Sequence, residues 1–117
     1  MLTRLPNWQS LLSAYLVTAA AEPFAYGRFD CGLFVAGAID AMTGVDVVPG
    51  IRGEYGNRRA AFAQVQLLCG ASTMEALASC LTARYGMAEV VPLMAHRGDV
   101  VQLRRGASEK CPRDCLP

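Results

Sequence analysis

The segment from Asp30 to Gly44 constrains the fold most, because it carries the start, the apolar face and the end of one helix. Aspartate is a favoured N-cap residue, since its carboxylate accepts hydrogen bonds from the free backbone N–H groups of the first turn. Gly44 supplies the left-handed backbone conformation that commonly ends a helix. Between them, apolar residues recur at helical spacing: Cys31, Phe34, Val35, Ala38, Ile39 and Met42. One whole face of this helix must therefore pack into a core.

Three further segments have helical periodicity with start or stop signals, namely residues 7–21, 58–69 and 74–86. A Ser-x-x-Glu capping box beginning at Ser72 marks the start of the last one. Residues 45–57 contain so many glycines and prolines that they favour a loop, with a short extended piece at two valines. Up to residue 86 the chain is therefore predicted to be mostly helical.

The last part of the chain has a different character. Residues 89–91 and 99–103 are rich in β-branched side chains and flank a turn at 97–99, which predicts two strands. Residues 104–117 show no periodicity of either kind. We therefore expect one α+β domain over residues 1–103 and an irregular tail over 104–117.

Composition excludes several classes of function. The net charge is +1 and like charges cluster only in two arginine pairs, so the chain lacks the basic surface that binds nucleic acid. The longest apolar candidate, residues 11–21, is shorter than the roughly 20 residues needed to cross a bilayer. We expect no nucleic-acid partner and no membrane span.

The N-terminal segment has two interpretations. Arg4 before an apolar stretch that ends in three alanines resembles a secretory signal cleaved after Ala21. The apolar stripe through Trp8, Leu12 and Tyr15 instead favours an amphipathic helix, which a signal sequence does not need. The second interpretation places the protein in the cytoplasm, and the first makes it a small secreted protein.

Five cysteines are an odd number at irregular spacings, unlike the disulfide framework of a small secreted domain. Cys111 and Cys115 flank a short Pro-Arg-Asp segment and are candidates for a bond of their own. A zinc centre needs about four ligands, and the chain contains a single histidine. We therefore expect no metal and no cofactor.

Cys31 is the strongest candidate for chemistry, because it stands in the first turn of its predicted helix. Unpaired backbone N–H groups and the helix dipole stabilise a thiolate there, which would make Cys31 a nucleophile. The alternative is a buried core residue, since Cys31 also lies on the apolar stripe and free cysteines are commonly buried.

A resemblance to known proteins adds to this position. The segment Pro23 to Val35 resembles the part of NlpC-type papain-like cysteine peptidases in which Pro-Tyr and Gly precede Asp-Cys-Ser-Gly at the head of the nucleophile helix. Gly98 to Val101 resembles the Gly-Asp entry to that family's first core strand. A wider pattern is similar to a small family of unknown activity encoded in phage and prophage tail-gene neighbourhoods: Trp8, Pro23 to Gly27, Asp30-Cys31, Thr43 to Asp46, Arg52 to Tyr55 and Arg97 to Val101.

The resemblance implies a papain-like fold, with helices packed on a small antiparallel sheet. Because residues 104–117 do not resemble the further strands of such a sheet, we expect it to be incomplete at the C-terminus, through truncation or a frame shift. The resemblance also implies a thiolate that attacks an amide, assisted by a histidine on the strand after the Gly-Asp turn. Peptidoglycan stem peptides would be the substrates of an active form. This sequence departs from the pattern, since Phe24 and Gly32 replace a Tyr and a Ser of the family. No histidine follows the Gly-Asp turn, and His96 before it is a weak candidate for the base.

Two functions remain from the resemblance. One is a thiol hydrolase with Cys31 as nucleophile, acting on peptidoglycan peptides. The other is a degenerate peptidase-like protein of a phage tail, with Tyr26, Arg52 and Tyr55 as contact residues for other tail proteins. Because no histidine follows the Gly-Asp turn, we favour the degenerate protein over the active hydrolase. Such a protein would be cytoplasmic or associated with the virion.

Overall fold

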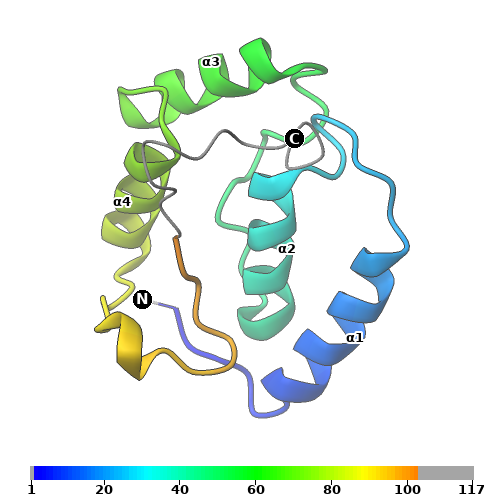
Figure 1. Ribbon diagram of the computed structural model, residues 1–117, viewed down its shortest axis with the longest axis vertical. Coiled ribbons are helices and arrows are strands. Elements are labelled where there is room, and N and C mark those ends of the chain that lie inside the picture. The colour runs from blue at the N-terminus through cyan, green and yellow to red at the C-terminus, as the bar shows by residue number, and fades with distance from the viewer. Residues whose placement is uncertain (1, 103–117) are drawn as a thin grey trace, which may run out of the picture.

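Helices make up the regular structure of residues 2–102, the part of the chain that the computed structural model describes. They are α1 (Trp8–Ala20), α2 (Cys31–Thr43), α3 (Arg58–Cys69), α4 (Met74–Tyr85) and a short 3-10 helix, η1 (Pro92–Met94). In Figure 1, α2 lies in the middle, with α1 on one side and the hairpin of α3 and α4 around the other. The helices therefore form two pairs, α1 with α2 and α3 with α4, and α2 lies between α1 and the α3–α4 hairpin.

The ends of α2 confirm the signals in the sequence. The Asp30 side chain accepts a hydrogen bond from the backbone N–H of Leu33 at 3.0 Å. Gly44 takes a left-handed conformation with φ of 77°, and its N–H donates to the Asp40 carbonyl oxygen at 2.7 Å. The predicted N-cap and the predicted stop are both correct.

The hairpin helices also begin and end close to where the sequence predicts. Asn57 caps α3 by accepting a hydrogen bond from the Ala60 N–H at 2.8 Å. The N-cap of α4 is Thr73, one residue after the predicted Ser72, because the Thr73 hydroxyl accepts the hydrogen bond from a free N–H of the first turn. Glycines in the left-handed conformation end both helices.

The core is built on α2. Its centre is a cluster of buried residues from α2 and from the loop after it: Leu33, Ala36, Ile39, Val47 and Val48. On the other side, α1 buries Leu12 and Ala19. The absence of a side chain at Gly37 of α2 lets Tyr15 of α1 come close, since a Cβ there would stand 2.3 Å from the Tyr15 hydroxyl oxygen. That hydroxyl donates to the Phe34 carbonyl oxygen at 2.7 Å. The amphipathic interpretation of the first segment is therefore correct.

The papain-like fold of helices on an antiparallel sheet is wrong for the described part of the chain. Between residues 2 and 102 the only β-type pairing is an isolated bridge between Ala25 and Phe29. The predicted strand 89–91 is irregular and leads into η1, whose first residue is a proline that cannot donate to a ladder.

The second predicted strand, at 99–103, fails for a related reason. Val100 and Val101 are 59% and 53% exposed and have no strand partner among residues 2–102, so their β propensity finds no sheet to join. The turn before them is correct, since the Asp99 N–H donates to the His96 carbonyl oxygen at 3.0 Å. Leu103, the predicted tail at 104–117 and the Cys111 and Cys115 pair lie outside the described residues.

Candidate functional site

Cys31 is the first residue of α2, and its side chain is exposed. It follows Asp30 directly, so the loop that delivers the helix cap also delivers the thiol. The prediction that Cys31 lies in the first helical turn is therefore correct, and the alternative of a buried core cysteine is wrong.

Asp30 is the most highly connected polar side chain near the thiol. Only 6% of Asp30 is exposed, and its two carboxylate oxygens accept three hydrogen bonds. One comes from Leu33 N–H, one from Gly27 N–H at 3.1 Å, and one from the Tyr55 hydroxyl at 2.5 Å. These donors satisfy the buried carboxylate and fix the loop before α2 against the loop after it.

Tyr55 depends on a close approach between those two loops. Gly27 has φ of 80°, and a Cβ at this position would lie 2.0 Å from the Tyr55 carbonyl oxygen. The Gly53 N–H also donates to the Gly27 carbonyl oxygen at 2.8 Å. Burial raises the pKa of the Tyr55 hydroxyl, and the hydrogen bond to Asp30 and its charge raise it further. Tyr55 therefore remains a protonated donor to Asp30 at neutral pH.

The electrostatics at Cys31 work against a thiolate. Partial burial of the Cys31 thiol beside an apolar cleft raises its pKa, and the charge of the adjacent Asp30 carboxylate raises it further. Backbone N–H groups of Gly32 and of Cys31 itself act in the opposite direction, as expected at a helix start, but they do not prevail. At neutral pH the thiol therefore carries its proton.

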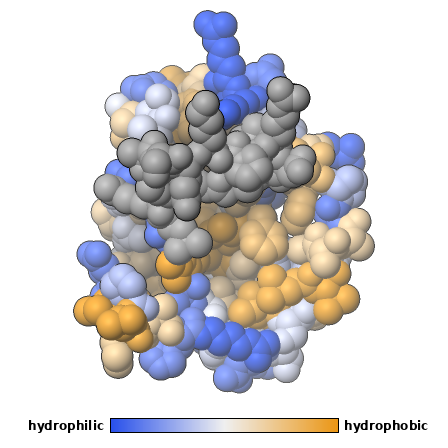
Figure 2. Space-filling model, in the orientation of Figure 1, coloured by the Kyte–Doolittle hydropathy of each residue, from blue (hydrophilic) through white to orange (hydrophobic). Residues whose placement is uncertain are grey.

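Cys31 lies at the edge of an apolar cleft of about 440 Å³ between α2 and the α3–α4 hairpin. Figure 2 shows apolar surface in the hollow at the middle of the molecule. The wall on α2 includes Val35 and Ile39, and the opposite wall includes Val65 and Leu68 of α3 and Leu81 of α4. Such a cleft is suited to an apolar ligand or an apolar segment of a partner.

The expected contact residues divide into two groups. Tyr26 and Tyr55 both line the cleft and are half-buried, with the Tyr26 ring standing edge-on to Phe24 at 4.9 Å between ring centres. Arg52 does not line the cleft; it is exposed and forms an ion pair with Asp46 at 2.7 Å. The structure therefore brings both tyrosines together with Cys31 and leaves the arginine outside.

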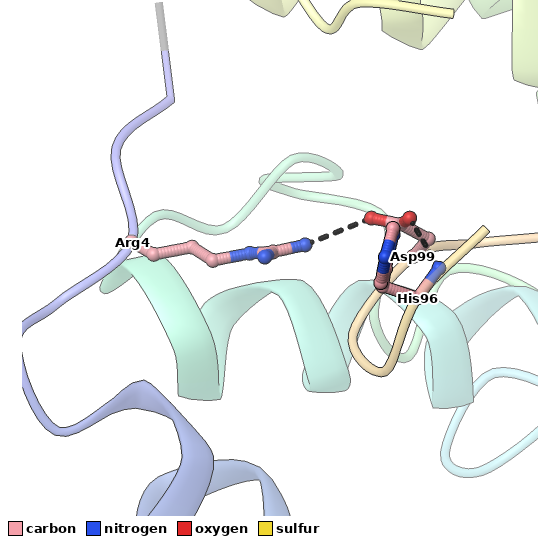
Figure 3. Close-up of polar contacts among 3 residues, drawn as sticks. All are labelled: Arg4, His96 and Asp99. Atoms are coloured by element: carbon pink, nitrogen blue, oxygen red, sulfur yellow. Dashed lines mark hydrogen bonds and ion pairs between the residues drawn. The ribbon is translucent and has the colours of Figure 1, made fainter. Parts of the chain in front are cut away.

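His96 belongs to a turn that is fixed at the opposite end of α2 from Cys31. Figure 3 shows Arg4 reaching Asp99, to which the His96 backbone N–H also donates. Gly98 of the same turn packs against Trp8 and against Met42, near the last residue of α2.

The length of α2 then separates the two groups. At 1.5 Å per residue, the part of α2 from Cys31 to Met42 spans roughly 16 Å. A general base must lie within hydrogen-bond reach of its proton, directly or through one water. His96 and Cys31 are therefore not brought together as a catalytic pair.

Two further absences apply to residues 2–102 alone. No group of three or more His, Cys, Asp or Glu side chains there is arranged to hold a metal ion. No helix in the same stretch combines the length and the apolar composition needed to cross a bilayer.

Sequence reasoning missed the bond between Asp30 and Tyr55 and the α3–α4 wall of the cleft. The two residues of the bond are 25 positions apart, and no local pattern links them. The apolar stripes on α3 and α4 predict an apolar face, but they do not say that this face borders an open cleft.

Comparison with known proteins gives a family and no activity. No curated protein and no solved structure matches the chain. The model of a domain family of unknown function, DUF6950, matches residues 3–112, which is most of the sequence. This chain therefore belongs to the DUF6950 domain family.

Proposed function

We propose that this chain is a non-catalytic binding module whose apolar cleft, at the Cys31 end of α2, holds an apolar segment of a partner protein. The observation that carries the proposal is the state of the thiol. Cys31 stands at the edge of the cleft with a raised pKa, and the only histidine of the sequence lies beside the other end of α2. The apolar cleft supports binding, while the described residues place no histidine near the thiol to activate it.

The resemblance of Pro23 to Val35 to the nucleophile segment of NlpC-type peptidases supports a relationship to enzymes that bind peptides. The wider resemblance to proteins of phage and prophage tail-gene neighbourhoods supports a tail protein as the partner. Under this proposal the protein is cytoplasmic during assembly and then associated with the virion.

A second candidate, a thiol hydrolase acting on peptidoglycan stem peptides, is favoured by one observation. Cys31 is exposed in the first turn of α2, where two backbone N–H groups favour the thiolate, although the pKa is raised overall. This function needs a base that residues 2–102 do not place near the thiol. It therefore predicts cleavage only if another part of the chain or a partner supplies that base.

One experiment separates the two candidates. The full chain is titrated with a synthetic stem tetrapeptide and with a set of short peptides rich in Leu, Val and Phe, and is followed by NMR and mass spectrometry. The proposal expects apolar peptides to shift the amides of Cys31 to Ala36 and of Val65 to Leu68, with every peptide remaining intact. Cleavage that is lost in Cys31→Ser would establish the hydrolase instead.

Two neighbouring leucines provide a matched control for the cleft. Leu68 is half-buried and lines the cleft, whereas Leu67 is 81% exposed and does not line it. Leu68→Trp fills part of the cleft and should weaken peptide binding at least about tenfold, the effect of losing roughly 1.4 kcal/mol. Leu67→Trp adds the same side chain outside the cleft and should leave binding unchanged. Equal behaviour of the two variants would overturn the cleft as the binding site.

A further inference from the structure

The α3–α4 hairpin contains a pair of thiols that the proposed function does not use. Cys69 is the last residue of α3, and Cys80 lies in the middle of α4; both are half-buried and unbonded. The Cys80 thiol lies 3.8 Å from the carbonyl oxygen of Leu68. Cys69 follows Leu68 directly, and the Cys80 thiol is close enough to raise the pKa of the Cys69 thiol. The two sulfurs are therefore neighbours.

Both cysteines of this pair belong to helices and not to a loop. Gly70 ends α3 in a left-handed conformation, and the Thr73 hydroxyl caps α4 a few residues later. Cys80 comes about two helical turns into α4, and its thiol lies against the Leu68 carbonyl oxygen near the end of α3. Because both cysteines are held by helices, the contact between them is a built feature of the hairpin.

We propose that Cys69 and Cys80 form an oxidative modification site, which low-molecular-weight disulfides such as oxidised glutathione convert into an intramolecular disulfide between α3 and α4. One protein thiolate attacks a sulfur of the small disulfide, forms a mixed disulfide and releases one small thiol. The second protein thiol then attacks the protein sulfur of that mixed disulfide and releases the other small thiol. The two cysteines lose two electrons and two protons, and the small disulfide is reduced to two thiols.

The surroundings of the pair slow thiol–disulfide exchange at neutral pH, but they do not prevent it from reaching equilibrium. Burial raises the pKa of the Cys69 thiol to about 11, and the hydrogen bond and charge of Cys80 contribute, while Arg84 opposes them. Cys69 thus remains protonated at neutral pH, which makes its attack on a small disulfide slow. Oxidation is then set by the ratio of small disulfide to small thiol.

The bridge would act on one wall of the cleft. Neither cysteine lines the cleft, but Leu68 next to Cys69 and Leu81 next to Cys80 both do. Closing a short loop by a disulfide restricts the unfolded chain and stabilises the folded one. Oxidation should therefore raise the Tm of the protein by roughly 10 °C.

Trypsin makes the test direct, because the arginines of the chain divide its cysteines. Cleavage after Arg59 and Arg84 places Cys69 and Cys80 together in one peptide, residues 60–84, and Cys31 in another, residues 29–52. The full-length protein is equilibrated in glutathione buffers of increasing oxidised fraction, alkylated, digested without reduction and weighed. We expect peptide 60–84 to become lighter by two hydrogens and to carry no alkyl group.

Variants separate the bridge from other thiol reactions. Cys80→Ser should leave only a glutathione adduct on Cys69, and Cys31→Ser should leave the bridge unchanged, so the result does not depend on the proposed function. Glutathione adducts on both cysteines of the wild-type peptide, free thiols at every oxidised fraction, or a bond to another peptide would each overturn the inference. Circular dichroism of the wild-type protein before and after oxidation confirms that the fold is intact.

Discussion

The two helix pairs on either side of the cleft differ in how well they are packed. The pair of α1 and α2 buries apolar residues on both helices, including Leu12, Leu33 and Ile39. In the pair of α3 and α4, no residue is buried. Both pairs have helical periodicity and stop or start signals, so the signals that form a helix do not determine how deeply it is buried. The burial of a helix depends on which other segments pack against it.

The difference has a local cause. Gly37 lets Tyr15 of α1 approach the α2 backbone, and a hydrogen bond from Tyr15 then holds the two helices together. The apolar faces of α3 and α4 instead line the cleft, and no residue of either helix is buried. We therefore expect the same substitution to cost more in the first pair than in the second.

The largest expected contrast is between two glycines. Gly27 and Gly70 have φ of 80° and 78°, so an alanine has the same left-handed penalty of about 1 kcal/mol at either position. A Cβ at Gly27 would also stand 2.0 Å from the Tyr55 carbonyl oxygen, whereas nothing lies within 4 Å of a Cβ at Gly70. Gly27→Ala should lower the free energy of unfolding by at least about 3 kcal/mol and Gly70→Ala by about 1 kcal/mol. Urea unfolding of both variants measures this.

If the two glycine variants lose the same stability, the loops before and after α2 do not approach each other as described. The support of Asp30 by Tyr55 would then fail as well. A Gly27→Ala protein that does not fold at all agrees with the account, provided that Gly70→Ala folds.

Matched leucine truncations test the packing itself. Leu33 of α2 is 4% exposed, whereas Leu68 of α3 is half-buried at the cleft. Leu33→Ala should cost about 3 kcal/mol, since it leaves a cavity in the core. Leu68→Ala should cost about 1 kcal/mol, because its side chain already borders open space. Thermal and urea unfolding would contradict the comparison if Leu68→Ala proved the more damaging of the two.

A pair of tyrosines tests the polar support of α2. Tyr55→Phe removes one of three donors to the buried Asp30 and should cost about 1.5 kcal/mol. Tyr85→Phe at the end of α4 removes a hydroxyl that has no hydrogen bond within the described part of the chain, and should change stability very little. Denaturant unfolding at neutral pH gives both values. An equal loss in the two variants would show that the Tyr55 bond does not support Asp30.

The smallest expected effect is a loss of stability in acid, confined to the α1–α2 side. Hydrogen bonding from the His96 backbone N–H and from Arg4 lowers the pKa of Asp99. Burial alone would raise the pKa of Asp46, but hydrogen bonds and the charge of Arg52 lower it overall. A carboxyl whose folded pKa lies below its unfolded pKa stabilises the fold above the unfolded value, about 3.9, and loses this as pH falls further.

Unfolding free energies measured from about pH 6 down to about pH 3 should therefore stay level and then fall below about pH 4. Asp46→Asn should make that decline shallower, because an amide does not titrate. If the mutant and the wild type fall in parallel, other carboxylates cause the loss. A rise in stability as the pH falls through this range would reverse the sign of the account.

The sequence predicts the helices well and their surroundings poorly. Caps and glycine stops are local, so Asp30, Gly44 and Gly70 mark the helix ends through residue type and spacing alone. The predicted sheet rests on β-branched residues alone, and a strand also needs a partner that no local pattern reveals. Val100 and Val101 have the propensity but find no partner among residues 2–102.

The candidate site follows the same division. The position of Cys31 at a helix start follows from the cap beside it, and the structure confirms it. The pKa does not follow, because the residue that caps the helix also brings a negative charge next to the thiol. The helix start alone predicts a lowered pKa, and only the partial burial of the thiol and the charge of Asp30 reverse the expectation.

The pH dependence of Cys31 alkylation tests the central claim most directly. Native and denatured protein are treated with iodoacetamide over a pH series, and modification of peptide 29–52 is measured by mass spectrometry. We predict that the native rate reaches its midpoint at a higher pH than the denatured rate, which should follow a free thiol near about pH 8.5. A native midpoint below that of the denatured protein would show an activated nucleophile and would contradict the binding module in favour of an enzyme.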